Sequence, residues 1–424
     1  MFIKSLKNNK ELPKLISVVL DQACMSITTL STTVVLARTY SKENYADIVL
    51  LFTIALFILG LQSAVIVKPF AISRNDTKHD PNSVRKSFIF TLNIKFLFTF
   101  ILLIVFPVLY TFSFENWDST QFLLFLLYIF SHSSYFFIRE IMLSQRKTVQ
   151  NLKYGLLCAT GIITFLAFIY FNQITNFTIF LSTASGIYLL LTVSYFIANY
   201  KGELITKKEY YQLWEGNWRI GKWLLGSNFL FHVSTNIYPW LLLYITSKND
   251  IAILGVLMSI AGLVNPLLTA LSSYLLPIFV DINKDYKKIK NAVAKWMLLF
   301  GSLAALLVIF GCFSGQFLIA TLFGNKYENL GWLVVLPFVV QSINIFFQPF
   351  KIALNAIKRT DINFWVLIPR SVIAISLGYI MITKFGLYGV FYTMIVENLV
   401  YQLIHFGIYR NIIGKDHHLQ HFKV

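Results

Sequence analysis

The chain has 424 residues, of which 57% are hydrophobic, only 13% are charged and 40 are phenylalanine. A soluble core of this length does not need so apolar a composition, which argues against a soluble enzyme and predicts a protein that crosses a membrane many times. The net charge of +17 would suit nucleic acid, but the distribution of Lys and Arg along the chain gives it another cause.

Twelve apolar segments are long enough to cross the ~30 Å hydrocarbon layer as helices. We expect spans at about 15–37, 46–67, 87–110, 121–143, 152–171, 177–199, 222–246, 251–276, 292–313, 330–354, 362–383 and 386–409. The outer loops then hold few cations, namely Arg38, Lys42, Lys248, Lys326 and Lys384. The positive-inside rule therefore places both termini in the cytoplasm, and we expect no nucleic-acid partner.

The first span is unusually polar. Four lysines precede it, as in a signal peptide, but it is too long for a signal-peptide core and lacks a small-residue cleavage pattern. It carries Asp21 among several Ser and Thr residues, so we expect it to line a cavity. Asp21 should lie at a depth similar to Lys95 and Arg370. These three could form a buried ion-pair set, a packing triad, or a gated site for substrate and ion.

Arg139 and Glu140 end the fourth span near the predicted cytoplasmic interface, where solvated or headgroup contacts explain their charges. The following linker, from Lys201 to Lys222, mixes aromatic and basic residues. Trp214 and Trp218 are four residues apart, so on a helix they share a face that suits the lipid interface.

The linker separates two halves of the chain. We predict an N-terminal lobe at 1–200, an amphipathic cytoplasmic linker at 201–221, a C-terminal lobe at 222–412 and a cytoplasmic tail at 413–424. A weak internal repeat supports the two lobes, because Ser41-Lys42 and Ser247-Lys248 each open the second span of a six-span half. Six prolines lie within or beside spans of the second lobe and predict bends there. The expected fold is all-α, with about 12 transmembrane helices in two six-helix lobes around a central cavity.

The eleventh span carries Pro369 and Arg370 near its middle. A charge at a helix centre costs roughly 2.5 to 3.5 kcal/mol on insertion scales, so such a residue usually serves a purpose. A buried carboxylate, snorkelling toward the headgroups, or an anionic ligand could each offset this cost. The sequence leaves all three open.

Motifs for chemical catalysis are missing. The chain contains no GxxxxGK[ST], HExxH or GxSxG, and Cys24, Cys158 and Cys312 each stand alone in an apolar run. No cofactor and no metal site are expected, and the chain is predicted not to be an enzyme.

Four short motifs carry a family resemblance, and one of them, Ile253-Leu254-Gly255, opens the eighth span. Phe323-Gly324-Asn325-Lys326-Tyr327 before the tenth span, Phe385-Gly386-Leu387-Tyr388-Gly389 at the last span, and Glu43-Asn44-Tyr45-Ala46 at the second resemble patterns of Wzx-like polysaccharide-biosynthesis flippases. These belong to the multidrug/oligosaccharidyl-lipid/polysaccharide exporter superfamily. Ala46 departs from the pattern, since the family usually has Gly there.

The resemblance implies a flippase of the bacterial cytoplasmic (inner) membrane that translocates an undecaprenyl-diphosphate-linked oligosaccharide, such as an O-antigen, lipopolysaccharide or capsule unit. A polysaccharide polymerase is then a candidate partner. Lys95 and Arg370 would give each lobe one buried cation for the diphosphate, and Arg139 is a third candidate. The family is thought to use an ion gradient, and Asp21 and Glu397 are candidates for coupling to a proton or sodium.

Three alternatives remain. A multidrug exporter of the same fold would be expected to favour acidic cavities for cationic drugs, and two buried cations argue against it. A membrane polymerase or ligase would need outward-facing catalytic groups, usually on a large loop, which this chain lacks. A scaffold would not need charges deep in its spans.

Overall fold

A computed structural model describes residues 12–73, 81–113, 118–199, 205–283, 285–357 and 361–414 of the protein. Within these ranges every regular element is a helix. The protein is an all-α integral membrane protein, as the composition predicted. Residues 200–204 around the start of the predicted linker, and 415–424 of the predicted tail, lie outside the described residues.

The expected spans correspond to helices along the chain. Nine helical segments in the described part are long and apolar enough to cross a membrane. Each of the twelve expected spans falls on one helix or on consecutive helices. Three of them are interrupted, at Ile237, at Leu263–Val264 and at Phe347.

The contacts divide the chain into two units, residues 1–232 and 233–424. The division falls within α9, which therefore contributes to both units, and the predicted lobe and linker boundaries stay predictions. The first unit contains the following helical elements in order: α2 (Leu12–Thr39), α3 (Lys42–Gln62), the π-helical η1 (Ser63–Val67), α4 (Lys68–Ser73), α5 (Pro81–Ser113), α6 (Ser119–Ser144), α7 (Thr148–Phe171), α8 (Phe177–Asn199) and most of α9 (Lys207–Asn236).

The second unit begins near the end of α9. Its elements are α10 (Tyr238–Ile245), α11 (Lys248–Gly262), α12 (Asn265–Asp281), α13 (Tyr286–Phe323), the short turns η2 (Asn325–Tyr327) and η3 (Gly331–Val334), α14 (Leu336–Phe346), α15 (Gln348–Ala356), α16 (Asp361–Phe385), α17 (Leu387–Tyr409) and η4 (Arg410–Gly414). Phe279, Phe300 and Tyr409 belong to its buried core.

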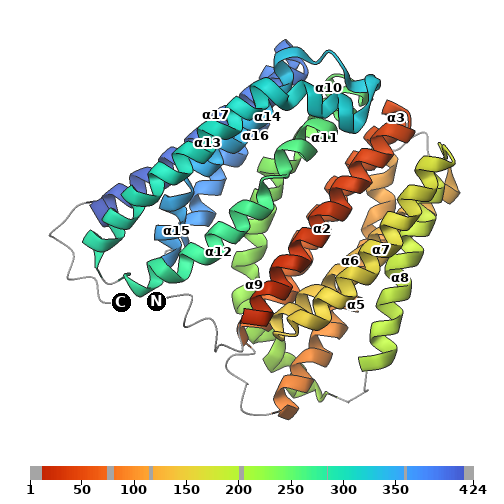
Figure 1. The fold of residues 1–424 in the computed structure, drawn as a ribbon. Coiled ribbons are helices and arrows are strands. Elements are labelled where there is room, and N and C mark those ends of the chain that lie inside the picture. The colour runs from red at the N-terminus through yellow and green to blue at the C-terminus, as the bar shows by residue number, and fades with distance from the viewer. Residues whose placement is uncertain are drawn as a thin grey trace. The chain divides into compact units, whose positions relative to one another are not determined.

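The two units repeat the same helix pairing. In the first unit, α2 packs along α7, and α6 packs along α8 (Figure 1). In the second, α10 packs on α16, and α14 packs on α17. The helix α3 is N-capped by Ser41, whose side chain accepts from the Asn44 amide, and α11 is N-capped by Ser247 in the same way. The weak repeat in the sequence therefore coincides with equivalent helix starts and equivalent packing.

Prolines mark the helix breaks of the second unit. Pro239, Pro266, Pro337 and Pro349 each lie in the first turn of a helix, where a missing N–H costs little. Pro369 instead lies inside α16, which continues across it. The first four prolines therefore coincide with the starts of new helices.

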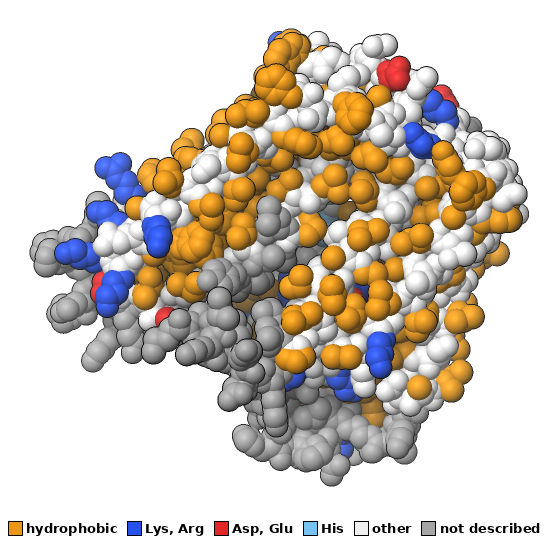
Figure 2. Space-filling view, in the orientation of Figure 1, with side chains coloured by type: hydrophobic (Ala, Val, Ile, Leu, Met, Phe, Trp, Pro, Cys, Tyr) orange, Lys and Arg blue, Asp and Glu red, His pale blue; other side chains and the backbone are white. Residues whose placement is uncertain are grey.

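Apolar side chains cover the outer faces of the helices. Figure 2 shows hydrophobic residues over much of the visible surface, with Lys and Arg gathered near helix ends. On α5 the side chains of Phe96, Phe100 and Ile104 are each more than half exposed. Such a surface is stable only where lipid covers it, which agrees with the membrane assignment.

Two glycines of the family-like motifs have a structural reason. Gly324 adopts φ +77° at the end of α13, a conformation that side chains disfavour. At Gly389 an added Cβ would lie 2.1 Å from the Met381 carbonyl oxygen, so only glycine lets α17 approach α16 this closely. These glycines are required by the turns and packing of the fold.

Candidate functional site

Each unit contains a buried polar cluster in its helices. The first unit buries Asp21, Lys95 and Arg139, and the second buries Arg370 and Glu397. Because ionisable groups inside membrane helices are costly, these two clusters are the candidate functional sites.

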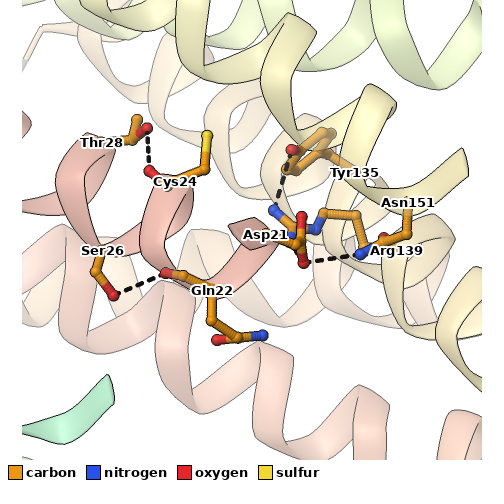
Figure 3. A network of polar contacts seen from close by, with 8 residues as sticks. All are labelled: Asp21, Gln22, Cys24, Ser26, Thr28, Tyr135, Arg139 and Asn151. Carbon is orange, nitrogen blue, oxygen red and sulfur yellow. Dashed lines mark hydrogen bonds and ion pairs between the residues drawn. The ribbon is translucent and has the colours of Figure 1, made fainter. Parts of the chain in front are cut away.

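Asp21 forms an ion pair with Arg139. Its Oδ2 accepts from Arg139 Nη2 at 2.5 Å and from Asn151 Nδ2 at 2.8 Å. Asp21 and Asn151 are fully buried, and the Arg139 side chain is 5% exposed. Figure 3 shows Asp21 reaching from α2 toward the other two residues, while Gln22 and Ser26 point elsewhere. Three helices are therefore joined at one carboxylate.

Aromatic rings surround the guanidinium of this pair. The Arg139 carbon Cζ lies 5.7 Å from the Tyr135 ring centroid and 5.8 Å from that of Phe136. Arg139 Nη1 also donates to the Tyr135 hydroxyl at 3.3 Å. The expectation of solvated or headgroup contacts for Arg139 is wrong, because α6 continues to Ser144 and places Arg139 inside the packed bundle.

The polarity of α2 is largely satisfied within the helix itself. Thr28 and Thr32 donate to carbonyls one turn back, at 2.8 Å each, and Ser26 does the same at 2.9 Å. Such back-bonding lets hydroxyls lie in an apolar setting. The Ser and Thr residues of α2 therefore support a cavity-lining role less than the sequence suggested. Asp21 is the main remaining reason to expect that α2 lines a cavity.

Lys95 of α5 has neutral partners. Its Nζ donates to Gln62 Oε1 at 2.5 Å and to Ser133 Oγ at 2.9 Å, and the residue is 3% exposed. Glu140 influences Lys95 electrostatically, but no carboxylate in the described part of the chain forms an ion pair with it. The expected grouping of Asp21 with Lys95 is therefore not formed, because α2 packs on α7 and presents Asp21 to Arg139 instead.

A cavity of about 150 Å³ lies beside Lys95, among α5, α6 and α8. Its walls are mostly apolar, with Phe96, Phe130, Phe137 and Phe196 contributing rings. An ammonium group has three hydrogens, and Lys95 uses two in the contacts above. The third N–H of the buried Lys95 ammonium group can therefore donate to a further partner.

Arg370 forms an ion pair with Glu397 in the second unit. Arg370 Nη2 donates to Glu397 Oε1 at 3.2 Å and to Asn398 Oδ1 at 3.4 Å. Arg370 is 8% exposed and Glu397 is 1% exposed. Of the three ways to offset the charge of Arg370, the structure shows the carboxylate. It also brings together two residues that the sequence had assigned to different roles.

A second cation lies in this cluster. Lys351 Nζ is 4.8 Å from the Tyr401 ring centroid, and Arg370 Cζ is 4.9 Å from the same centroid. Lys351 forms no ion pair with any described residue. Two cations therefore lie at one aromatic ring, and the carboxylate of Glu397 is paired with Arg370, which leaves the cluster with an excess of positive charge.

Sequence reasoning missed Lys351. It lies in the nine-residue helix α15, close to the predicted cytoplasmic end of its span, where a lysine needs no special explanation. The preceding Pro349 was a usable signal, because it lies in the first turn of a new helix that begins at Gln348.

Comparison with known proteins identifies the fold. No family model and no curated protein matches the chain. Among solved structures, it is similar to an inward-facing multidrug resistance MATE family transporter of the MOP superfamily, with a TM-score of 0.73 and 15% identity over 94% of this chain and 98% of that one. It is also similar to a MATE transporter from Vibrio cholerae, with a TM-score of 0.65 and 11% identity over 97% and 98% of the two chains.

A third similar structure is a MOP superfamily transporter from Pyrococcus furiosus. Its TM-score is 0.61, with 14% identity over 94% of both chains, and it is described as having a binding pocket of reverse polarity. At these identities the likeness establishes the fold: the chain has the architecture of MATE transporters of the MOP superfamily. The narrower resemblance to polysaccharide flippases stays a prediction.

Proposed function

We propose that this chain, which has the fold of membrane transporters, is a flippase for an undecaprenyl-diphosphate-linked oligosaccharide. It would move that substrate to the outer leaflet of a bacterial cytoplasmic membrane by alternating access. O-antigen, lipopolysaccharide or capsule repeat units are the proposed glycans, and a polysaccharide polymerase that joins them is the proposed partner. No step here is chemical catalysis.

The observation that carries this proposal is the charge balance of the second cluster. Arg370 and Lys351 lie at one ring, and Glu397 is paired with Arg370, whereas Lys351 forms no ion pair with any described residue. An excess of cations attracts an anion and repels organic cations. A diphosphate suits this pair, because Arg offers a planar fork of donors and Lys a compact point charge.

Lys95 supports the same substrate in the first unit. Its amine is buried against neutral partners, so an incoming phosphate oxygen would not compete with a carboxylate for it. The neighbouring aromatic walls suit apolar or sugar-ring contacts. Arg139 remains a candidate for binding the diphosphate because it is positively charged, although it is paired with Asp21 in this structure.

The two arginine–carboxylate pairs suggest how an ion gradient could act. In each unit one carboxylate, Asp21 or Glu397, holds one arginine. Binding of a proton or sodium ion at the carboxylate would weaken that pair and release the guanidinium for an anionic substrate. We propose Asp21 and Glu397 as the coupling residues on this basis. Asp21→Asn should then transport without dependence on the ion gradient, and an unchanged dependence would contradict this role.

Multidrug export is the second candidate, because one similar structure is a multidrug resistance transporter. The buried acids Asp21 and Glu397 are the groups in this chain that would face an organic cation. Each is already paired with arginine, which disfavours a cationic drug. The drug sensitivity of cells that lack the protein distinguishes this candidate from the flippase.

The deciding experiment follows the lipid-linked oligosaccharide in cells that lack this protein. Its amount and its access to a membrane-impermeant probe at the outer leaflet are measured together. We expect intact units to accumulate and to stay shielded from the probe. Exposed but unjoined units would indicate a polymerase, and altered drug sensitivity with normal glycan would indicate an exporter.

A further inference from the structure

The first half of α9 docks on the first unit through one face. Asn217 Nδ2 donates to the Val65 carbonyl oxygen at 2.6 Å, and Glu209 Oε1 lies 2.6 Å from Lys86 Nζ. The Tyr210 ring meets Phe90 edge to face at a centroid distance of 4.9 Å. These contacts fix which side of the helix faces the rest of the first unit.

The side of the helix next to this docked face carries aromatic rings. Tyr211 is 68% exposed and Trp218 is 40% exposed. Trp214 stacks on Trp218 with ring centroids 5.8 Å apart and planes 12° from parallel. At 100° per residue these three positions fall on one stripe of the helix. Tyr211 and Trp218 are thus exposed, and Trp214 is partly exposed.

Four cations lie on the same side. We call Lys207, Lys208, Tyr211, Trp214, Trp218, Arg219 and Lys222 together the outer face of α9. None of its four cations forms an ion pair within the part of the chain that the structure describes. Glu215 is the acid on this side, whereas Glu209 lies on the docked side and is held by Lys86. The outer face therefore carries a clear positive excess.

The length of α9 places this face at the membrane surface. The helix has 30 residues, which corresponds to about 45 Å at 1.5 Å per residue, more than the ~30 Å hydrocarbon layer. Its second half belongs to the predicted seventh span, so its first half must extend into the headgroup layer. The distribution of Lys and Arg puts that end on the cytoplasmic side.

We propose that the outer face of α9 is a binding site for the headgroups of anionic phospholipids in the cytoplasmic leaflet. The four cations would contact lipid phosphates, and the Trp and Tyr rings would lie among the headgroups and glycerol groups, where such rings are most stable. This site is separate from the buried clusters and does not depend on which substrate the protein moves.

The test uses full-length protein in nanodiscs of phosphatidylcholine with increasing phosphatidylglycerol, and native mass spectrometry counts the lipids that stay bound. A variant with Lys207, Lys208, Arg219 and Lys222 all changed to Gln should need about tenfold more phosphatidylglycerol for the same occupancy, because each cation near the surface adds to the attraction. The single variant Glu215→Gln should bind it more tightly, since it removes the acid of the outer face.

A matched control removes Lys287, Lys290 and Lys295 from the exposed start of α13. It lowers the charge at another predicted cytoplasmic helix end and should leave most of the phosphatidylglycerol preference in place. Equal losses in both charge variants, or no loss in the α9 variant, would overturn the proposal. Displacement of the lipid by free glycerol phosphate would also overturn it, because the site would then recognise a soluble phosphate. Normal elution and helix content of each variant exclude misfolding as the cause.

Discussion

Asp21 and Arg139, 118 residues apart in the chain, form a buried ion pair of 2.5 Å that joins α2 to α6. Asn151 adds a bond from α7 to the same carboxylate oxygen. Breaking such a pair by removing one partner leaves an uncompensated buried charge, whereas removing both partners does not.

We predict that Arg139→Met lowers the free energy of unfolding by about 3 to 5 kcal/mol, because Asp21 would remain buried without its cation. The double variant Asp21→Asn/Arg139→Met should recover most of this loss. Thermal unfolding in detergent measures both. If the double variant loses as much unfolding free energy as the two single variants together, the ion pair is not the cause of the loss.

Arg370→Ala should abolish translocation of the lipid-linked oligosaccharide, whereas Arg370→Lys should retain part of it. Alanine removes the donor fork, while lysine keeps the charge. Lys351→Gln should weaken substrate binding, by about 2 kcal/mol if it directly contacts a buried phosphate. Transport into sealed vesicles by correctly inserted protein measures each effect.

Glu397→Gln is the matched control for the arginine variants. It removes the same ion pair but keeps the cation, so the variant should still bind the anionic substrate. Its transport should become independent of the ion gradient. Wild-type transport by inserted Arg370→Ala protein would refute the role of Arg370, and loss of binding in Glu397→Gln would assign both effects to broken structure.

The hydrogen bond from Asn217 to Val65 predicts that substitution of Asn217 changes amide hydrogen exchange near Val65. Pro69 cannot offer the N–H that a regular α-helix would supply to the Val65 carbonyl, and the Asn217 side chain donates to it instead. Asn217→Leu leaves that carbonyl without this donor, at an expected cost of about 1 to 3 kcal/mol. Amide hydrogen exchange should therefore rise in residues 63–73.

Gln212→Leu provides the comparison for this variant. Gln212 is exposed on the same helix, so the same type of substitution there removes no contact with η1. Exchange in residues 63–73 should stay at the wild-type rate. Equal exchange in both variants would mean that Asn217 does not stabilise the helix break.

The ion pair of Glu209 with Lys86 predicts a pH dependence at the start of α9. The hydrogen bond from Lys86, together with bonds from Thr206, lowers the pKa of Glu209 to about 2. The pKa is lower in the folded state than in the unfolded chain, so the carboxylate stabilises docking fully above the unfolded value and progressively less as pH falls through about 2. Docking should thus persist at pH 4.

Lys86→Met should return the pKa of Glu209 toward its ordinary value and make docking weaken near pH 4. Amide exchange in the first turns of α9, measured from pH 3 to 6, tests this with the wild-type protein in parallel. The prediction fails if both proteins show the same pH profile.

The sequence by itself determined the class, the spans and the helix breaks. Apolar length and the distribution of Lys and Arg depend on each segment and its flanks, so they are readable without knowing any neighbour. The caps at Ser41 and Ser247 and the breaks near Pro239 and Pro349 are local in the same sense. The sequence also identified Asp21, Arg139, Arg370 and Glu397 as residues to examine.

Only the tertiary structure decided which of these charges meet. The pairing of Asp21 with Arg139 rather than Lys95 depends on how α2 packs against α6 and α7, and hydrophobic periodicity does not specify a partner 118 residues away. Lys351 belongs to the second cluster because α15 packs on α17, which carries Tyr401. The sequence around a charged residue shows that the residue lies within a span. The packing between helices decides which residue it pairs with.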